Sequence, residues 1–167
     1  MAGIKVKVNL SIIKDIRKLT SSKYTDPIAE SILDQMKDVI STGLSPIRGF
    51  GRFEAYKAQS RNRGGKKTGY PYNVQTKFPG KKVRPVNLEL SGDMLDALDY
   101  KNVRDGIELS IYKKAEAEKA KTHQQGTDLV PQRRFIPSTK GEQFITSITV
   151  SIKKMFVEAL DKIIRSE

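Results

Sequence analysis

Two prolines near the end of the chain constrain its fold more than any other feature. Pro131 and Pro137 enclose QRRFI, within the longer sequence HQQGTDLVPQRRFIPSTKGEQF of residues 123–144. A proline ring fixes its own φ and pushes the residue before it out of the α region, so this stretch cannot continue a helix. Gly126 is placed to end the helix that precedes it. We therefore predict an extended segment that carries an apolar anchor at Phe135 between two fixed corners.

Both flanks of this extended segment are predicted to be helical. Residues 113–125 are polar and rich in strong helix formers. Residues 141–165 keep apolar side chains at spacings of three and four, which is typical of an amphipathic helix. Ser138 or Thr139 is placed to cap it. The Thr and Ser residues of 145–151 make a strand the alternative there, but the helical period fits the full length.

The N-terminal half contains a second well-marked helix. Asp26 is placed to cap it, and Pro27 suits the first helical position, where no hydrogen-bond donor is missed. Gly43 supplies the stop. A shorter helix before it fits the apolar spacing between residues 9 and 19. The stripe expected to face the core consists of Ile28, Ile32, Met36, Val39 and Ile40.

The strand signals are short. Residues 3–8, GIKVKV, alternate apolar and basic side chains as an edge strand does. The Asp-Gly pair that ends at Gly106 marks the turn of a hairpin over about residues 99–112. A three-residue loop ending at Gly106 is favoured over a two-residue turn, because it places Val103 and Ile107 on one face.

Together these elements predict an α+β fold. A small antiparallel sheet, formed by the hairpin and the possible N-terminal strand, packs against helices, and a further helix begins after Ser91. The length of 167 residues suits a single domain, residues 1–167. Residues of about 45–85 lack any period and are rich in Gly, Pro and basic side chains, so we expect a long flexible loop or arm there.

Positive charge is concentrated in that loop. The chain has a net charge of +12, and eleven basic residues but a single acidic one, Glu54, lie from Arg48 to Arg84. Phe and Tyr residues are interleaved with them, and cations next to aromatic rings suit single-stranded nucleic acid or RNA. The alternative is contact with acidic protein surfaces or with DNA in a lumen. The candidate arm contacts are Arg52, Arg61, Arg63, Lys66, Lys67, Lys81 and Lys82.

Residue types that carry catalysis are sparse. The chain has no cysteine and one histidine, His123, which excludes disulfides and thiolate metal sites. No HxxxH pattern or acidic cluster accompanies His123, and no serine lies in a nucleophile elbow. The glycines of residues 49–51 lack the strand, helix and lysine of a phosphate-binding loop. We expect no catalytic site, metal or cofactor, and no run of about 18 apolar residues predicts a membrane span.

Two motifs resemble those of phage tail-completion proteins, which include the virion-morphogenesis and head-tail joining families. HQQGT followed by VPQRRFIP before a terminal helix is similar to their pattern His-Gln-x-Gly … Ile-Pro-x-Arg-Pro-Phe-Leu. LSGDMLDA, residues 90–97, is similar to their Leu-x-x-(Thr/Ser)-Gly-x-Leu-x-x-Ser. Arg134 stands where those families usually have a second proline, and Lys119 where an aromatic residue usually precedes Ala120. The motifs cover roughly the C-terminal half of the chain.

The resemblance implies a structural protein of the virion, located in the tail or neck and assembled in the bacterial host cytoplasm. Such a subunit works by assembly and without catalytic turnover, in a ring that is expected to be a homo-hexamer at the head-proximal end of the tail. The implied partners are the tail-tube protein on one side and the head connector or stopper on the other, with DNA passing through. This favours protein or lumenal DNA as the neighbour of the basic loop. The alternative hypothesis is a basic RNA- or DNA-binding protein.

The residues of the first motif are the candidate subunit contacts. Arg133 and Arg134 fit an interface, where arginine and aromatic side chains are favoured, but they also fit ion pairs with the chain's own acids. The sequence leaves both interpretations open. The candidate interface residues are His123, Gln124, Gly126, Pro131, Arg133, Arg134 and Phe135.

The arm hypothesis makes a prediction for limited proteolysis. If the basic loop becomes ordered only on a partner, trypsin should cut the isolated protein between Arg61 and Lys67 and leave the C-terminal half whole. Mass spectrometry of the fragments identifies the cut sites. A loop that resists trypsin under the same conditions would contradict the hypothesis.

Overall fold

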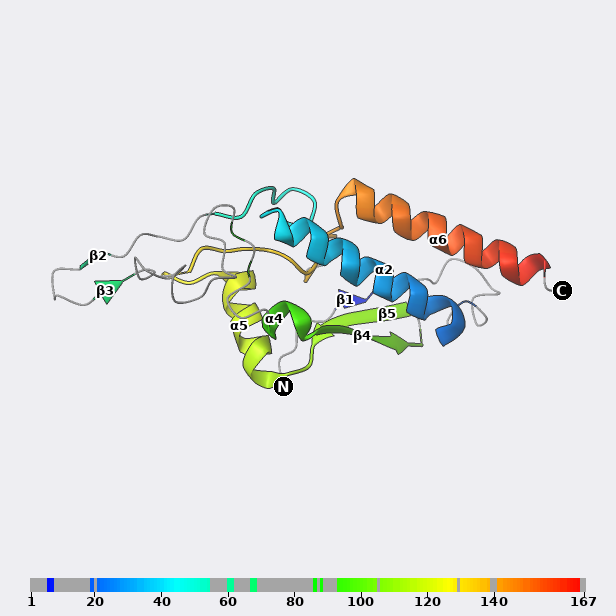
Figure 1. Ribbon diagram of the computed structural model, residues 1–167, viewed down its shortest axis with the longest axis horizontal. Coiled ribbons are helices and arrows are strands. Elements are labelled where there is room, and N and C mark those ends of the chain that lie inside the picture. The colour runs from blue at the N-terminus through cyan, green and yellow to red at the C-terminus, as the bar shows by residue number, and fades with distance from the viewer. Residues whose placement is uncertain are drawn as a thin grey trace.

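The computed structural model describes residues 6–7, 19, 21–54, 60–61, 67–68, 86, 88, 93–104, 106–128, 130–138 and 141–165. These residues form an α+β fold, as the sequence predicts. Helix α2 (Ser22–Ser41) packs on a three-stranded sheet, and helix α6 (Thr146–Arg165) packs on α2, so that α2 lies between the sheet and α6 (Figure 1). None of the helices in these described ranges combines the length and the hydropathy that a membrane span needs.

The central strand of the sheet is β5 (Gly106–Ile111). It pairs antiparallel with β4 (Leu98–Val103) on one side and with β1 (Val6–Lys7) on the other. The predicted hairpin and the predicted N-terminal edge strand are therefore both confirmed. Leu109 of β5 has a register partner in each neighbouring strand, which fixes the alignment of all three.

The hairpin turn differs from the prediction. Val103 is the register partner of Gly106, which leaves two residues in the turn, so the three-residue loop is wrong. Asn102 is the partner of Ile107, and opposite residues of an antiparallel pair share a face. The Asn102 side chain occupies that face, where its Nδ2 donates to Asp26 Oδ1 of α2 at 2.6 Å. Val103 therefore turns to the other face.

Tyr100 of β4 also faces the start of α2. Burial raises the pKa of its phenol above the ordinary value, and the Asp26 and Glu30 carboxylates raise that pKa further. A neutral hydroxyl is thereby favoured next to the acidic side chains of α2.

Helix α2 begins one turn earlier than predicted. The backbone N–H groups of Tyr24 and Thr25 both donate to the Ser21 carbonyl oxygen, at 3.0 and 3.1 Å, so a first turn forms ahead of the proline. Asp26 is inside the helix, and the prediction that it caps the helix is wrong. Pro27 removes one hydrogen-bond donor from the helix without ending it.

The other end of α2 confirms the predicted stop. Gly43, at φ 80°, donates its N–H to the Ile40 carbonyl oxygen at 2.8 Å, and Leu44 donates to that of Val39 at 3.3 Å. This pair of bonds is the Schellman arrangement, in which a left-handed residue closes the last turn. The predicted apolar stripe is buried apart from Val39, which is half-buried and packs against the core.

Helix α6 begins at Thr146, later than predicted. A cap at Ser138 is therefore wrong, and Thr139 lies outside the described residues. The backbone N–H of Ile145 donates to the Pro46 carbonyl oxygen at 2.9 Å, which holds the chain extended up to that point. The helix starts where this pairing ends, and its period then continues along the chain as predicted.

The remaining elements are short or polar. The predicted polar helix is α5 (Lys114–Gln125). The helix predicted after Ser91 is a single turn, α4 (Asp93–Asp96), because the chain then enters β4. Strands β2 (Ser60–Arg61) and β3 (Lys67–Thr68) form a separate two-stranded pair.

The helix expected between residues 9 and 19 lies outside the described residues except for Leu19. Leu19 is helical and buried, and it packs against Ala159 and Ile163 of α6 in a small second cluster. The C-terminal part of α6 thus has an apolar contact apart from the main core.

The loop expected over residues 45–85 begins later than predicted. Residues 45–54 belong to the folded body, where Ile47 and Phe53 are buried and Leu44 bridges to Arg52. Their glycines and proline form fixed turns, which a composition-based prediction cannot distinguish from a flexible chain. Most of the remaining loop lies outside the described residues.

Five parts of the chain contribute large and fully buried apolar side chains to the main core. They are α2, residues 43–54, β5, the segment between the two prolines and α6: Ile28, Ile32, Met36 and Ile40; Ile47; Ile107 and Leu109; Phe135 and Ile136; Ile148. The proline-flanked segment is therefore a structural part of the core, although it is neither helix nor strand.

Candidate functional site

Residues 126–128 and 130–138 belong to a strap that runs back along the last turn of α5. Gly126 ends α5 at φ 74° and ψ 166°, a backbone region that is almost restricted to glycine. After a turn, the N–H of Arg133 donates to the His123 carbonyl oxygen at 2.6 Å, which returns the strap to the helix. The end of α5 is therefore the support on which the strap is laid.

The side chain of Gln124 makes the hydrogen bonds to the middle of the strap that a neighbouring strand would make in a sheet. Its Oε1 accepts from the N–H groups of Phe135 and Ile136, at 3.0 and 3.3 Å, and its Nε2 donates to the Ile136 carbonyl oxygen. Gln124 itself is buried. Because a buried backbone group without a partner is costly, one amide satisfies three groups that the strap would otherwise leave exposed to an apolar interior.

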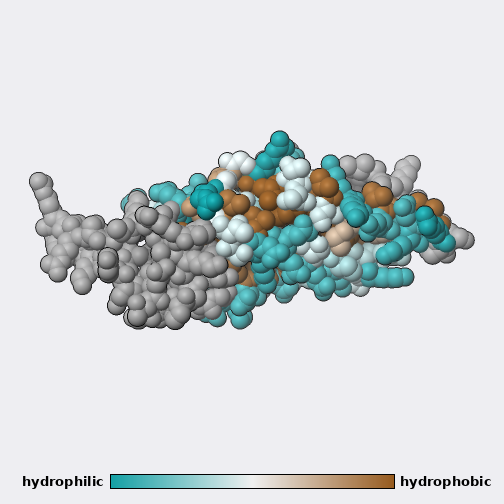
Figure 2. Space-filling view, turned by 45° about the horizontal axis from the view of Figure 1, so that its top comes forward, coloured by the Kyte–Doolittle hydropathy of each residue, from teal (hydrophilic) through white to brown (hydrophobic). Residues whose placement is uncertain are grey.

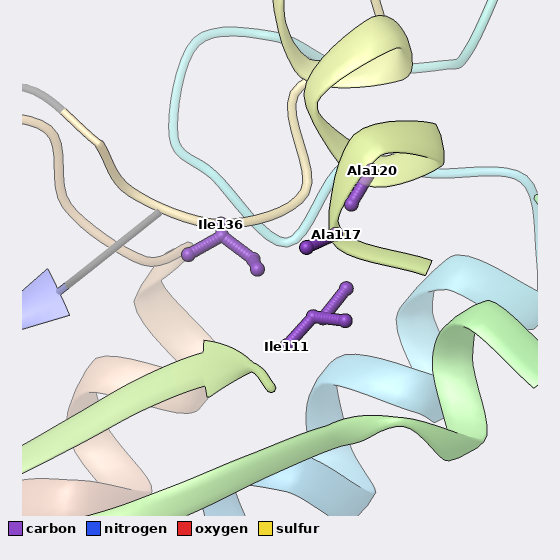
Figure 3. Close-up of a pocket in the computed structure, with 4 residues that line it drawn as sticks. All are labelled: Ile111, Ala117, Ala120 and Ile136. Atoms are coloured by element: carbon purple, nitrogen blue, oxygen red, sulfur yellow. The ribbon is translucent and has the colours of Figure 1, made fainter. Parts of the chain in front are cut away.

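The apolar side of the strap fills the space between α5 and the sheet. Figure 3 shows Ile136 pointing toward Ile111 of β5 and toward Ala117 and Ala120 of α5. The gap between these four side chains is too narrow for a water molecule. Alanine on α5 lets the strap approach closely, so this contact packs like a protein interior and is not a ligand pocket.

Arg133, which also belongs to the strap, is buried, with 1% of its surface exposed. Its Nε and Nη2 both donate to the Glu54 carbonyl oxygen, at 3.1 and 2.9 Å. Its Nη1 lies 3.2 Å from His123 Nδ1. A guanidinium only donates, so His123 Nδ1 is the acceptor and the imidazole proton is on Nε2. Arg133 thus joins residues 43–54 to α5 and to the strap.

A second tie connects residues 43–54 to the strap. Ser45 Oγ donates to the Arg134 carbonyl oxygen at 2.5 Å and accepts from the Ile47 N–H at 3.1 Å. Ile47 in turn bridges to Phe144, just before α6. We call this meeting point of residues 43–54, the end of α5, the strap and residues 141–145 the strap junction.

The outer side of the strap junction carries cations around an exposed ring. Arg134 Nη2 is 3.4 Å from Glu142 Oε1, and its guanidinium lies 5.6 Å from the centre of the Phe50 ring. Phe50 is 42% exposed, between the exposed side chains of Arg48 and Arg52. We call residues 48–52, RGFGR, the tip; Figure 2 shows apolar surface near the middle of the molecule, where this segment and the start of α6 lie.

The structure brings the predicted interface residues together but turns most of them inward. Gln124, Pro131, Arg133 and Phe135 are buried, whereas His123, Gly126 and Arg134 are partly exposed. The Glu142 contact of Arg134 agrees with the interpretation of an ion pair within the chain. Their role as subunit contacts stays a prediction.

Of the predicted arm residues, Arg52 alone has a described side chain, and it is exposed. Arg61 and Lys67 are placed in β2 and β3 by their backbones, and the other four lie outside the described residues: Arg63, Lys66, Lys81 and Lys82. The sequence predicted Phe50 only as one of several aromatic rings among the cations of the loop, and did not single it out as the exposed ring of a folded tip.

The side chains exposed at the strap junction suit contact with another macromolecule. Within them, no group of three or more His, Cys, Asp or Glu side chains is placed to hold a metal ion. A groove between the start of α2 and α6 has a volume of about 100 Å³, below the roughly 300–1,000 Å³ of ligand pockets. The strap junction presents arginine donors and an aromatic ring, which suit a macromolecular surface.

Comparison of the chain with known proteins finds no matching family, no matching curated protein and no matching solved structure.

Replacing Gly126 with alanine tests the close contact between α5 and the strap. A Cβ there would lie 2.9 Å from the Gln132 backbone nitrogen, at a φ of +74° that strains any L-residue. Gly51, at φ +58° with open space around a Cβ, is the matched control. We expect Gly51→Ala to lower the free energy of unfolding by about 1 kcal/mol and Gly126→Ala by at least about twice as much. Urea denaturation measures both, and equal losses would contradict the account.

Replacing Arg133 with methionine tests the buried guanidinium. We expect a loss of about 1–3 kcal/mol in unfolding free energy, because the Glu54 carbonyl loses two donors that come from a buried guanidinium. Arg133→Lys should recover only part of this, since an ammonium cannot reproduce the two-pronged contact. Arg134→Met is the control and should cost less than about 1 kcal/mol, the usual limit for a partly exposed ion pair. If the Arg134 variant lost as much stability as the Arg133 variant, the argument would be wrong.

Proposed function

We propose that this chain is a structural subunit of a phage virion, which completes the tail or joins it to the head connector by assembling into a ring. The observation that carries the proposal is that the residues of the tail-completion resemblance act as one unit. Gln124 binds the strap backbone at Phe135 and Ile136, and His123 binds Arg133 through its backbone and ring. The residues of the motif therefore hold one another in place, as a subunit with a fixed contact surface requires.

The tip is the surface that this unit supports. Ser45 fixes its base to the strap, and the N–H of Arg48 donates to the Gln143 carbonyl oxygen at 2.8 Å. Arginine and aromatic side chains are enriched at interface centres. A contact residue on fixed backbone loses less conformational entropy on binding than one on a mobile chain. We therefore assign Phe50 and its flanking arginines to a contact with the next subunit or with a virion partner.

A ring needs a head-to-tail contact between two different surfaces of each copy. In this proposal the tip is one of those surfaces. The ring, with six copies expected, contacts tail-tube subunits on one side and a connector or stopper on the other, and the basic residues 57–84 face acidic protein or passing DNA. Positive charge suits both neighbours, because acidic protein surfaces and DNA are both negatively charged.

A second candidate function is binding of RNA or single-stranded DNA. It is favoured by ten of the twelve excess positive charges between Arg48 and Arg84, with aromatic residues among them. Binding of this kind falls steeply as salt rises, because bound counterions are released. A fluorescent oligonucleotide titrated at several salt concentrations measures that slope.

The test of the ring uses two exposed aromatic residues of matched exposure. Phe50 is 42% exposed at the tip and Tyr112 is 40% exposed beyond the hairpin. We expect Phe50→Ser to abolish ring formation and joining to purified tails, and Tyr112→Ser to leave both unchanged, with both variants folded by circular dichroism. Light scattering after size exclusion measures the ring. A wild-type protein that forms no ring with tails and binds oligonucleotides at physiological salt would refute the proposal.

A further inference from the structure

The outer face of α6 carries an exposed apolar line. Val150, Val157 and Ile164 are 58%, 56% and 68% exposed. Single exposed apolar residues are common and need no explanation. These three, however, follow one another at intervals of seven residues, which places them on one side of the helix. Seven residues are nearly two helical turns, so the line drifts by only about 20° per heptad and runs about 21 Å along the helix. Figure 2 shows apolar side chains recurring along α6 among hydrophilic ones.

This line is on the side of α6 that faces away from α2. Ile148 and Ala159, which are buried, lie about half a turn around the helix from Val150 and Val157 respectively. Helix α6 is the outermost layer of the described fold, since α2 separates it from the sheet (Figure 1). It therefore has an inner apolar face that the chain covers and an outer one that remains exposed.

Charged side chains flank the line asymmetrically. On one flank, four residues after Val150 and Val157, stand Lys154 and Asp161. On the other flank, three residues after the same two positions, stand Lys153 and Leu160. The exposed ends of Lys154 and Glu158 are 3.9 Å apart, a solvated pair that holds Lys154 only weakly.

These flanks distinguish the two ways in which a second α6 can cover the line. In an antiparallel pair centred on Val157, like flanks meet, so Lys154 faces Asp161 of the second copy, twice by symmetry. In a parallel pair, unlike flanks meet, so Lys153 faces Lys154 of the second copy. The first arrangement places opposite charges together, and the second places like charges together.

We propose that α6 of this chain pairs antiparallel with α6 of a second copy, about a two-fold axis at Val157. Val157 then packs on Val157 and Val150 packs on Ile164 of the second copy, in a seam of coiled-coil type. This contact is isologous and closes a pair of chains. It is independent of the tip, which serves the head-to-tail contact of the proposed ring.

The absence of native cysteine makes the register directly testable in the full-length protein. Under mild oxidation, Val157→Cys should form a disulfide-linked dimer. Val150→Cys alone should not, but a mixture of Val150→Cys and Ile164→Cys should form a mixed dimer. Glu118→Cys, exposed on α5, is the control for random collision. Cross-linking of Val150→Cys with itself, or cross-linking at position 157 no greater than at 118, would overturn the proposal.

A charge exchange tests the flank without a covalent bond. Asp161→Lys should weaken the dimer at least about tenfold by sedimentation velocity, and Lys154→Glu added to it should recover most of the loss. Phe50→Ser should leave this dimer intact, which separates it from the proposed ring. A wild-type chain that stays monomeric at tens of micromolar, or an Asp161→Lys variant with unchanged dimerisation, would refute the pairing.

Discussion

The hydrogen bonds of Gln124 are the interaction on which the rest of the described structure depends. The strap carries Phe135 and Ile136 into the core, so its backbone becomes buried, yet it is neither helix nor strand. Buried backbone groups need partners, and one buried side-chain amide supplies them from the last turn of α5. Without it, the apolar anchor would bring unpaired polar groups into the interior.

The position of the strap then determines what lies around it. Arg133 reaches from the strap to the Glu54 carbonyl, and Ser45 reaches back to the Arg134 carbonyl. These bonds hold residues 43–54, which present the tip, and Ile47 bridges to Phe144 immediately before α6. The buried contacts of the motif thus set the direction of two outer surfaces, the tip and the outer face of α6. We propose that both are assembly surfaces.

Much of the fold was predictable because its signals are local. The two prolines imposed an extended backbone, the spacing of apolar residues predicted α2 and α6 as helices, and strong helix formers predicted α5. Their boundaries were wrong where a distant segment decides the outcome. Helix α6 begins only after Ile145 because Pro46, about a hundred residues earlier in the chain, accepts its N–H. No local pattern carries that information.

The sequence predicted which residues lie together at the candidate site, but not which way their side chains face. Gln124, Arg133 and Phe135 do lie together, yet they face inward, because the strap turns back onto α5 and buries them. An arginine close to an apolar anchor fits a surface contact and a buried donor equally well. Which one holds depends on whether a carbonyl, here that of Glu54, lies within reach. Phe50 was expected among the aromatic rings of a flexible loop, but its place on a folded tip follows from the path of residues 43–54, which the sequence did not predict.

Amide hydrogen exchange of the strap tests the central claim most directly. If Gln124 holds the strap as a neighbouring strand would, the N–H groups of Phe135 and Ile136 should exchange about as slowly as those in the middle of α2, and Gln124→Leu should accelerate them selectively. NMR or mass spectrometry reads these rates in the native protein. Rapid exchange at both positions while α2 stays protected would contradict the account.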